Sequence, residues 1–303
     1  MRNIRDLTRD LDRSGLWNLL VVYTVWSSTY LGIRIAVREG AGFPPFTLGF
    51  MRTVAGAIIL LTWAWFQKQS FRPNRKELNT LFFSGMLLWL GGNGLVTFAE
   101  QRVDSSLAAL VVAAIPIWSN IIDAILDRKR PSGFLIISLL VGFIGIAFLS
   151  YPNLSSGIRA DAIAMFALIG ATISWAIGSV MQARRPISLG NRVNAGYQML
   201  FGALGFGVVA ILLNEPSPMP TAEAWGAFVY LVIFGSVFGF TSYVTALKKL
   251  PTRIVMTYAY VNPVLAVILG WAILSEEITG WTLLGSFLVL VGVWGVFRER
   301  FQS

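Results

Sequence analysis

Long apolar runs follow one another along almost the whole chain, and short polar stretches separate them. A helix that crosses a membrane needs roughly 20 mostly apolar residues, because the hydrocarbon core is about 30 Å thick. Ten runs meet this requirement: 15–36, 45–67, 78–98, 105–126, 133–150, 160–181, 194–213, 223–246, 253–274 and 280–297. The runs lack the strict alternation that is typical of barrel strands, so the pattern predicts an all-α integral membrane protein with ten transmembrane helices.

The glycine and proline pattern of the first half recurs in the second half at one constant spacing. Six pairs share an offset of 147 residues: Gly49 and Gly196, Gly92 and Gly239, Ala99 and Ala246, Pro116 and Pro263, Gly133 and Gly280, and Gly145 and Gly292. Five spans per half is an odd number, so the second copy enters the membrane from the opposite side. The sequence therefore predicts two inverted five-helix repeats, 15–152 and 159–298, an arrangement typical of secondary transporters.

Basic residues are concentrated at one end of the predicted bundle. Lys and Arg total 24 against 15 Asp and Glu, which gives a net charge of +9. In the ten-span arrangement 19 of the 24 fall on the side of both termini, and only Arg38, Arg102 and Arg159 fall in the opposite loops. The positive-inside rule places the segments 1–14 and 299–303 in the cytoplasm, and it explains the charge without a nucleic-acid partner. Segment 1–14 is either a short interfacial helix or a frayed tail.

The residue types present exclude several kinds of chemistry. The sequence contains no Cys and no His, which rules out disulfides, thiol nucleophiles and the common zinc sites. It also lacks a Gly-x-Ser-x-Gly elbow and a P-loop, and no two carboxylates lie together at mid-depth. We expect no catalytic residue, no metal and no cofactor. An integral-membrane enzyme that uses Lys or Tyr, and a structural membrane protein, are the alternatives of another class.

Three motifs carry a family resemblance that covers nearly the whole chain. They are Trp-Ser-Ser-Thr-Tyr at 26–30, Ala-Ala-Leu at 108–110 followed by Pro116, and Asn262-Pro263 followed by Leu-Ser-Glu-Glu-Ile-Thr at 274–279. In this order the motifs resemble the EamA branch of the drug/metabolite transporter superfamily, and most of all its bacterial exporters of amino acids, including aromatic ones. The resemblance implies export by alternating access across a bacterial inner membrane. Lys129 departs from the glutamate that the family usually has after the fourth span.

Helix-breaking residues occur at matching places in the two halves. A proline inside a helix removes a backbone hydrogen bond, and paired Gly or Pro breaks mark substrate sites near the midplane of transporters. The predicted hinge residues are Pro116, Pro263, Gly91, Gly92, Gly94 and Gly239. The alternative is that the glycines only allow close helix packing and that the prolines are tolerated kinks.

Polar and aromatic residues recur at helical spacing around these breaks. Because polar groups are costly against lipid, these faces should point inward and line a central cavity between the halves, formed mainly by spans one, three, four, six, eight and nine. The predicted substrate-binding residues are Trp26, Tyr30, Asn93, Thr97, Trp118, Trp175, Ser179, Tyr243, Tyr258 and Asn262. The alternative is hydrogen bonding between helices in a closed bundle.

Charged residues within the spans restrict the substrate. Spans one, two, six, seven and nine contain no carboxylate deep in the membrane, and Asp123 lies near a span end, where a surface salt bridge is its expected role. Arg52 either extends to the membrane surface or meets a substrate carboxylate. We expect neutral or zwitterionic amino acids, with amphiphilic drugs or other metabolites as the alternative, moved by facilitated transport rather than proton coupling. The sequence makes no prediction of the oligomeric state.

Overall fold

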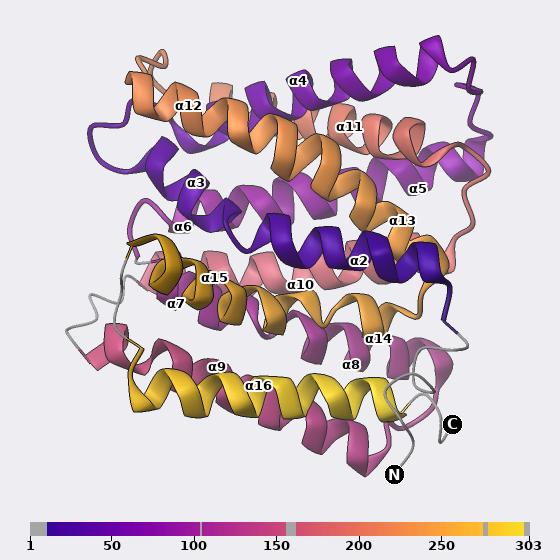
Figure 1. Ribbon diagram of the computed structural model, residues 1–303. Coiled ribbons are helices and arrows are strands. Elements are labelled where there is room, and N and C mark those ends of the chain that lie inside the picture. The colour runs from indigo at the N-terminus through magenta and orange to yellow at the C-terminus, as the bar shows by residue number, and fades with distance from the viewer. Residues whose placement is uncertain (1–10, 104, 156–161, 275–277, 300–303) are drawn as a thin grey trace.

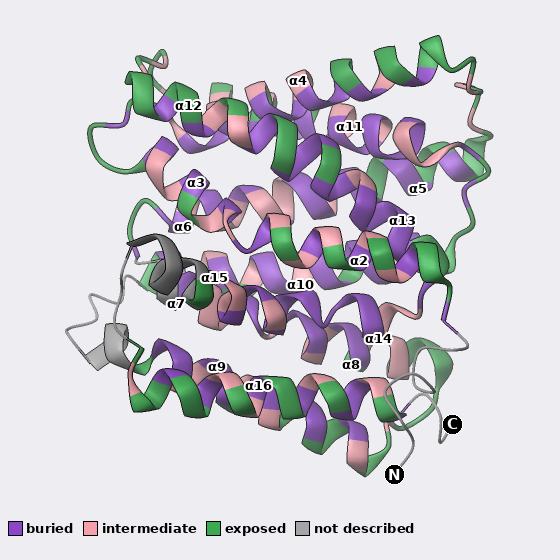
Figure 2. Ribbon diagram, in the orientation of Figure 1, coloured by how far each residue is buried: buried purple, intermediate pink, exposed green. Residues whose placement is uncertain are grey.

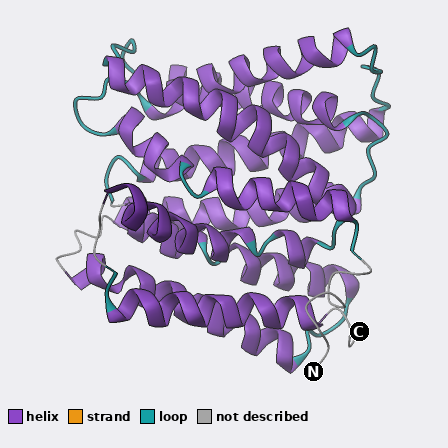
Figure 3. Cartoon of the chain, in the orientation of Figure 1, coloured by secondary structure: helices purple, strands orange, loops and turns teal. Residues whose placement is uncertain are grey.

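The computed structural model describes residues 11–103, 105–155, 162–274 and 278–299, and within these residues the chain is helical and has no strand (Figures 1 and 3). Nine helical stretches of the described part are long and apolar enough to cross a membrane. The tenth predicted span, 253–274, is formed by α14 (Thr252–Val255) and α15 (Tyr258–Leu274). The prediction of an all-α membrane protein is confirmed.

Five of the predicted spans are continuous helices, and the other five are interrupted. The continuous ones are α4 (Pro45–Phe66), α9 (Gly133–Ser155), α10 (Ala162–Arg184), α11 (Asn191–Leu212) and α16 (Gly280–Glu299). Besides span nine, two spans consist of two helices each: span one of α2 (Arg13–Trp26) and α3 (Thr29–Val37), and span four of α7 (Ser105–Val112) and α8 (Ile115–Asp127). Span three consists of α5 (Arg75–Gly85), the π-helix η1 (Met86–Gly94) and α6 (Leu95–Ala99). Span eight consists of α12 (Ala222–Tyr230), the π-helix η2 (Leu231–Phe240) and α13 (Thr241–Lys249).

Side-chain hydroxyls accompany the break in span one, which the sequence analysis treated as a single helix. Ser27 Oγ donates to the carbonyl of Thr24 at 2.7 Å, and Ser28 Oγ donates to the carbonyl of Val25 at 2.9 Å. A hydroxyl that bonds a nearby carbonyl competes with the helical backbone and often bends the helix. Span six, the counterpart of span one, is the continuous helix α10, so the two halves differ here.

Equivalent helices of the two halves pack against each other in antiparallel pairs. In α9 and α16, a β-carbon at Gly292 would lie 2.6 Å from the backbone nitrogen of Gly142, and one at Gly285 would lie 2.6 Å from that of Leu149. Since residue numbers rise along α9 as they fall along α16, the two helices run in opposite directions. The contacts of Gly49 with Phe206 and of Gly196 with Leu61 give the same result for α4 and α11. The repeat is therefore inverted.

The remaining spans also pair across the two halves. The interrupted span of α2 and α3 packs against that of α12, η2 and α13, and α10 packs against η1 and its flanking helices α5 and α6. Spans four and nine meet through α8 with α14 and α7 with α15. Each half consequently buries its helices largely against the other half, and both contribute to the centre of the bundle.

Exposed residues lie along the outer faces of the bundle (Figure 2), and many of them are large and apolar. Trp65 and Phe66 of α4, Phe166 of α10, and Ile211 and Leu212 of α11 are each more than 60% exposed. An exposed apolar surface of this extent marks contact with lipid or another apolar partner. The first described helix, α2, begins and the last, α16, ends at the same end of the bundle, at the right of Figure 1, which we refer to as the terminal end.

The packing of α9 against α16 predicts the effect of one added methyl group. In Gly292→Ala the new β-carbon would meet backbone atoms of α9, which cannot rotate away as a flexible side chain can, so we expect a stability loss of about 1–3 kcal/mol. Thermal unfolding of the purified protein in detergent measures it. Gly280→Ala is the matched control, because a β-carbon there meets nothing within 4 Å. An unchanged midpoint for Gly292→Ala would contradict this packing.

Candidate functional site

A cavity lies between the two halves of the bundle. It is lined by seven of the ten spans. The lining residues are Trp26, Thr29, Tyr30, Ile33, Arg52, Trp89, Gly92, Asn93, Val96, Val112, Ile115, Ala171, Thr172, Trp175, Gly235, Phe240, Tyr258 and Asn262. The six spans expected to line the cavity all do so, and span two adds Arg52.

Two π-helices border the cavity at corresponding places in the repeat. η1 in span three and η2 in span eight each have the wider turn that single π-helical segments introduce, often at functional sites. Gly92 of η1 and Gly239 of η2 are separated by the repeat offset. A β-carbon at Gly92 would lie 2.5 Å from the Trp175 ring, and one at Gly239 would collide with the Trp26 indole. These glycines are therefore where each half accepts a tryptophan from the other.

Each π-helix also accepts a hydrogen bond from the first helix of the other half. The indole Nε1 of Trp26 donates to the carbonyl oxygen of Gly235 in η2 at 3.0 Å. Ser174 Oγ in α10 donates to the carbonyl oxygen of Leu87 in η1 at 2.8 Å. These bonds use carbonyl groups within the bundle, where lipid offers no donors. They fix the first helix of each half against the wall of the cavity.

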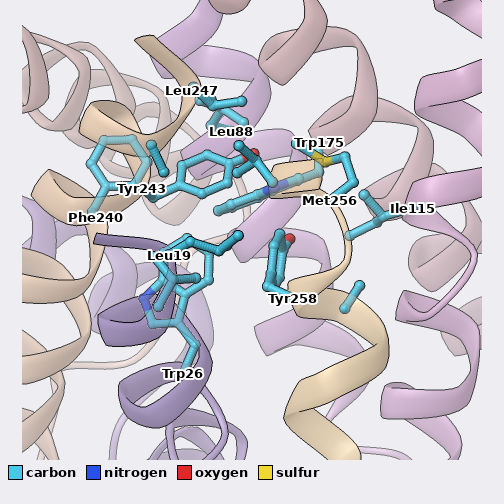
Figure 4. Packing of buried hydrophobic residues seen from close by; sticks show 14 of the residues in the cluster. Leu19, Trp26, Leu88, Ile115, Trp175, Phe240, Tyr243, Leu247, Met256 and Tyr258 are labelled. Carbon is cyan, nitrogen blue, oxygen red and sulfur yellow. The ribbon is translucent and has the colours of Figure 1, made fainter. Parts of the chain in front are cut away.

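Four aromatic side chains pack together in the buried core (Figure 4), and three of them, Trp26, Trp175 and Tyr258, line the cavity. This aromatic layer consists of Trp26, Trp175, Tyr243 and Tyr258, from α2, α10, α13 and α15. The Trp26 ring centroid lies 5.6 Å from that of Trp175 and 5.1 Å from that of Tyr258, both in edge-to-face contact. Trp175 Nε1 donates to the hydroxyl oxygen of Tyr243 at 3.0 Å, which also bonds Ser179 Oγ. The layer thus joins helices from both halves.

A second hollow, with an empty volume of about 1020 Å³, lies beyond the aromatic layer at the terminal end. Its walls include Asn120, Lys249 and the ion-paired Arg184. Arg184 contacts Asp123 at 2.7 Å and Asp127 at 2.6 Å, so the expected salt bridge of Asp123 is present. Leu247 of this wall belongs to the same buried cluster as the aromatic layer, together with Leu19, Leu88 and Met256 (Figure 4).

Two asparagines and two tyrosines provide neutral polar groups in the cavity wall. With its amide nitrogen toward the available acceptors, Asn262 donates to the carbonyls of Tyr23 and Tyr258, both at 3.1 Å, and so joins α2 to α15. Asn93 Oδ1 accepts from Arg52. Tyr30 also lines the cavity, from α3. The wall therefore offers amide and phenol groups beside aromatic rings.

The structure brings most, but not all, of the predicted binding residues to the cavity. Trp26, Tyr30, Asn93, Trp175, Tyr258 and Asn262 line it, while Tyr243 and Ser179 lie in or directly against the aromatic layer. Thr97 is not among the lining residues, and its buried hydroxyl donates to the carbonyl of Asn93 at 2.8 Å. Trp118 is half-buried and lies outside the cavity wall, because the break before α8 changes which residues of span four face inward. A role in substrate binding stays a prediction for all of them.

Five of the six predicted hinge residues lie at or next to irregular helix segments. Gly91, Gly92 and Gly94 belong to η1, and Gly239 belongs to η2. Pro116 is the second residue of α8, directly after the turn that ends α7, whereas Pro263 lies inside α15. That they act as hinges stays a prediction.

Arg52 is the cavity residue that sequence reasoning left undecided. Its side chain does not extend to the membrane surface, because it is only 3% exposed. Arg52 Nε donates to Ser236 Oγ at 2.8 Å, Nη1 donates to Asn93 Oδ1 at 3.3 Å, and the guanidinium carbon lies 5.4 Å from the centre of the Trp89 ring. The signal in the sequence was a single arginine inside an apolar run, and the partners became visible only in the fold.

Glu100 is a buried acid at the end of span three, and it was not among the predicted site residues. It follows α6 directly, at the end of the bundle away from the termini, and is 0% exposed. Its main-chain carbonyl accepts a hydrogen bond from Arg34, but among the described residues neither carboxylate oxygen has a hydrogen-bond partner. Burial raises the pKa of Glu100 to about 8, and the charge of Arg34 opposes this shift.

Sequence comparison relates the chain to known membrane proteins. The model of the EamA-like transporter family matches residues 13–151 and again residues 162–298. A protein of Escherichia coli (strain K12) named "Uncharacterized inner membrane transporter YedA" is 32% identical over 277 residues, which cover 90% of this chain and 88% of that protein. "Uncharacterized transporter YoaV" of Bacillus subtilis (strain 168) is 21% identical, with 91% and 94% covered.

Structure comparison agrees with the fold. A solved structure titled "Crystal structure of protein" superposes with a TM-score of 0.77 at 21% identity, and the match covers 96% of this chain and 99% of the other. At this identity the likeness shows a shared fold and nothing finer.

The burial of Glu100 predicts a pH dependence of stability. Folding raises its pKa from 4.5 to about 8, so ionisation favours the unfolded chain. The stability that the protonated carboxyl contributes is complete below pH 4.5 and is lost as the pH rises through about 8. Glu100→Gln stays neutral, so its unfolding midpoint should fall less than that of the parent between about pH 5 and about pH 9.

The matched control is Glu223→Gln, because Glu223 is exposed and pairs with Arg38 at the surface. Thermal unfolding in one detergent across this pH range compares the three proteins. Parallel curves for the parent and Glu100→Gln would show that the buried carboxyl does not titrate as described.

Proposed function

The chain belongs to the EamA-like transporter family and is thus a membrane transporter, and from this premise we propose that it exports amino acids, aromatic or other neutral ones, and related small metabolites. The proposed mechanism is alternating access by a secondary transporter in a bacterial inner membrane. The inner membrane is the location printed in the name of the Escherichia coli relative. The two moving halves are the predicted repeats, 15–152 and 159–298.

The observation that carries this proposal is the aromatic wall of the cavity. Trp26, Trp175 and Tyr258 line the space at edge-to-face angles, and Trp89 and Phe240 add further rings. Aromatic pairs in such offset or edge-to-face arrangements contribute roughly 0.5–1.5 kcal/mol each beyond their burial. A substrate with a ring or a compact apolar body, together with one or two polar groups, fits this lining.

The interrupted helices supply the flexibility that alternating access needs. Span four turns before Pro116, and spans three and eight widen at η1 and η2, next to the cavity. The aromatic layer closes the cavity toward the terminal end, and its rings come from helices of both halves. Rocking one half against the other would separate these rings and connect the cavity to the second hollow.

The charge distribution supports an orientation with both termini in the cytoplasm. The positive-inside rule then places the second hollow, whose wall includes Arg184, Lys248 and Lys249, on the cytoplasmic side. A substrate would enter there and leave at the opposite end. Facilitated movement is the coupling mode that we favour, because none of the residues that line the cavity is an acid or a histidine.

Amphiphilic drugs or other metabolites are a second candidate substrate class, and the largely apolar lining favours them equally. An integral-membrane enzyme remains the alternative of another class. The cavity wall offers it no carboxylate pair and no histidine for acid–base catalysis.

Flux into proteoliposomes tests the transport proposal. With radiolabelled L-phenylalanine and L-tryptophan, the parent protein should move label well above empty vesicles, and Trp26→Ala and Trp175→Ala should lower the rate by on the order of 10-fold or more. Trp17→Ala is the matched control, because Trp17 lies on the same helix as Trp26 but is 68% exposed. Label no higher than in empty vesicles would refute the substrate. Unchanged flux in both cavity variants would refute the site alone.

A pH gradient tests the coupling mode in the same vesicles. Facilitated movement should equalise the label on the two sides, whether or not the internal and external pH differ. Accumulation driven by the gradient would contradict facilitated transport, and its loss in Glu100→Gln would then identify the titrating residue.

A further inference from the structure

A buried cation in the cavity wall has only neutral partners. Arg52 is 3% exposed, and its bonds go to the hydroxyl of Ser236 and the amide oxygen of Asn93, with the Trp89 ring beside it. No ion pair of Arg52 occurs within the described part of the chain, and the cavity wall contains no Asp or Glu. The positive charge of the site is therefore not balanced by the protein's own residues there.

A buried charge without a counter-charge is unfavourable, and a bound ligand of opposite charge lowers this cost. Hydroxyl and amide oxygens are dipoles that only partly replace the hydration a guanidinium loses on burial. A structural arginine within a membrane bundle would be expected to pair with an acid or with backbone carbonyls, and the bonds of Arg52 go to neither. The absence of an acid around Arg52 points to a counter-charge that arrives with the substrate.

A buried donor near Arg52, the indole N–H of Trp89, lacks an acceptor in this part of the cavity. The bonds of Arg52 use Nε and Nη1, while Nη2 lies next to Gly235, where a β-carbon would come within 2.9 Å of it. Trp89 lines the same cavity, and its buried Nε1 has no hydrogen-bond partner among the described residues. A buried donor without an acceptor costs roughly 1–3 kcal/mol, which a bound ligand can recover.

We propose that the cavity recognises its substrate through a carboxylate group, which the guanidinium of Arg52 binds with the indole N–H of Trp89 as an additional donor. Guanidinium groups match carboxylates in both charge and planar geometry. The apolar body of the substrate packs on the aromatic layer. This inference rests on the proposed transport function and specifies the chemical class of its substrate.

The same geometry makes the amino group of an amino acid dispensable. The cavity wall offers an ammonium group amide and phenol oxygens and aromatic faces, but no carboxylate. An aromatic carboxylate without an amino group therefore retains the decisive contact, whereas an amine or amide that lacks the carboxylate loses it. Specificity should follow the carboxylate and not the ammonium group.

Ligand binding to the intact purified protein tests whether the carboxylate or the amino group of the substrate is required. Four probes of similar size are compared by thermal stabilisation in detergent: L-phenylalanine, phenylpropionate, phenylethylamine and L-phenylalaninamide. We expect stabilisation by the first two only. Stabilisation by phenylethylamine or L-phenylalaninamide equal to that by phenylpropionate, or no stabilisation by phenylpropionate, would overturn the proposal.

Variants locate the carboxylate contact at its two donors. Arg52→Gln keeps a hydrogen-bonding group but removes the charge, and should weaken phenylpropionate binding by on the order of 10- to 100-fold. Arg52→Lys keeps the charge but not the planar fork, and should recover part of the affinity. Trp89→Phe removes the indole N–H and keeps an aromatic ring, and should weaken binding by roughly 3- to 10-fold. Arg38→Gln is the control, because Arg38 is exposed and pairs with Glu223 outside the cavity.

The outcomes separate this inference from the transport proposal. If the parent moves L-phenylalanine but Arg52→Gln and Trp89→Phe bind phenylpropionate like the parent, transport stands and the carboxylate contact is refuted. If the four probes stabilise the parent as expected and the variants weaken phenylpropionate binding, but L-phenylalanine is not moved, the carboxylate contact stands and amino-acid export is refuted. Should Arg52→Gln fail to fold, the four-probe series on the parent and the Trp89→Phe variant still decide.

Discussion

Within a membrane bundle every polar group has to find its partner inside the protein, because lipid offers neither donors nor acceptors. Regular helices meet this requirement by themselves, but the cavity of this protein is built where the helices are irregular. The carbonyl groups of Gly235 and Leu87 in the two π-helices are bonded by Trp26 and Ser174 of the opposite half. The irregular backbone is therefore stable only because the two halves are packed together.

Because the repeat is inverted, the contact between a helix of one half and the π-helix of the other half occurs twice. Gly92 and Gly239 occupy equivalent positions, and each makes room for a tryptophan from the other half. The helix pair α9 and α16 and the pair α4 and α11 bring equivalent glycines to their contacts in the same way. Close packing at the edges of the bundle and a cavity at its centre thus follow from one set of small residues.

Much of the fold could be predicted because its signals are local or periodic. Span length and the repeat offset are both read along the chain, and the described helices agree with them. The candidate site was predicted less completely. Trp118 was predicted in the lining as an aromatic residue with an apolar face and a polar edge, but it lies outside the cavity wall, after the turn that precedes α8. Thr97 was assigned from its helical spacing to Asn93, but its hydroxyl is used by the backbone of its own helix.

The sequence by itself determined that this is a membrane protein of ten spans in two inverted halves, because hydrophobic length and a constant repeat offset need no knowledge of tertiary contacts. It also identified Trp26, Trp175 and Tyr258 as inward-facing, since polar-edged rings avoid lipid. Only the tertiary structure decided that Arg52 is buried and without an acid, because its neighbours Ser236, Asn93 and Trp89 come from other helices and as far as 184 residues away. The charge of a cavity depends on which distant side chains meet there, and chain packing alone determines that.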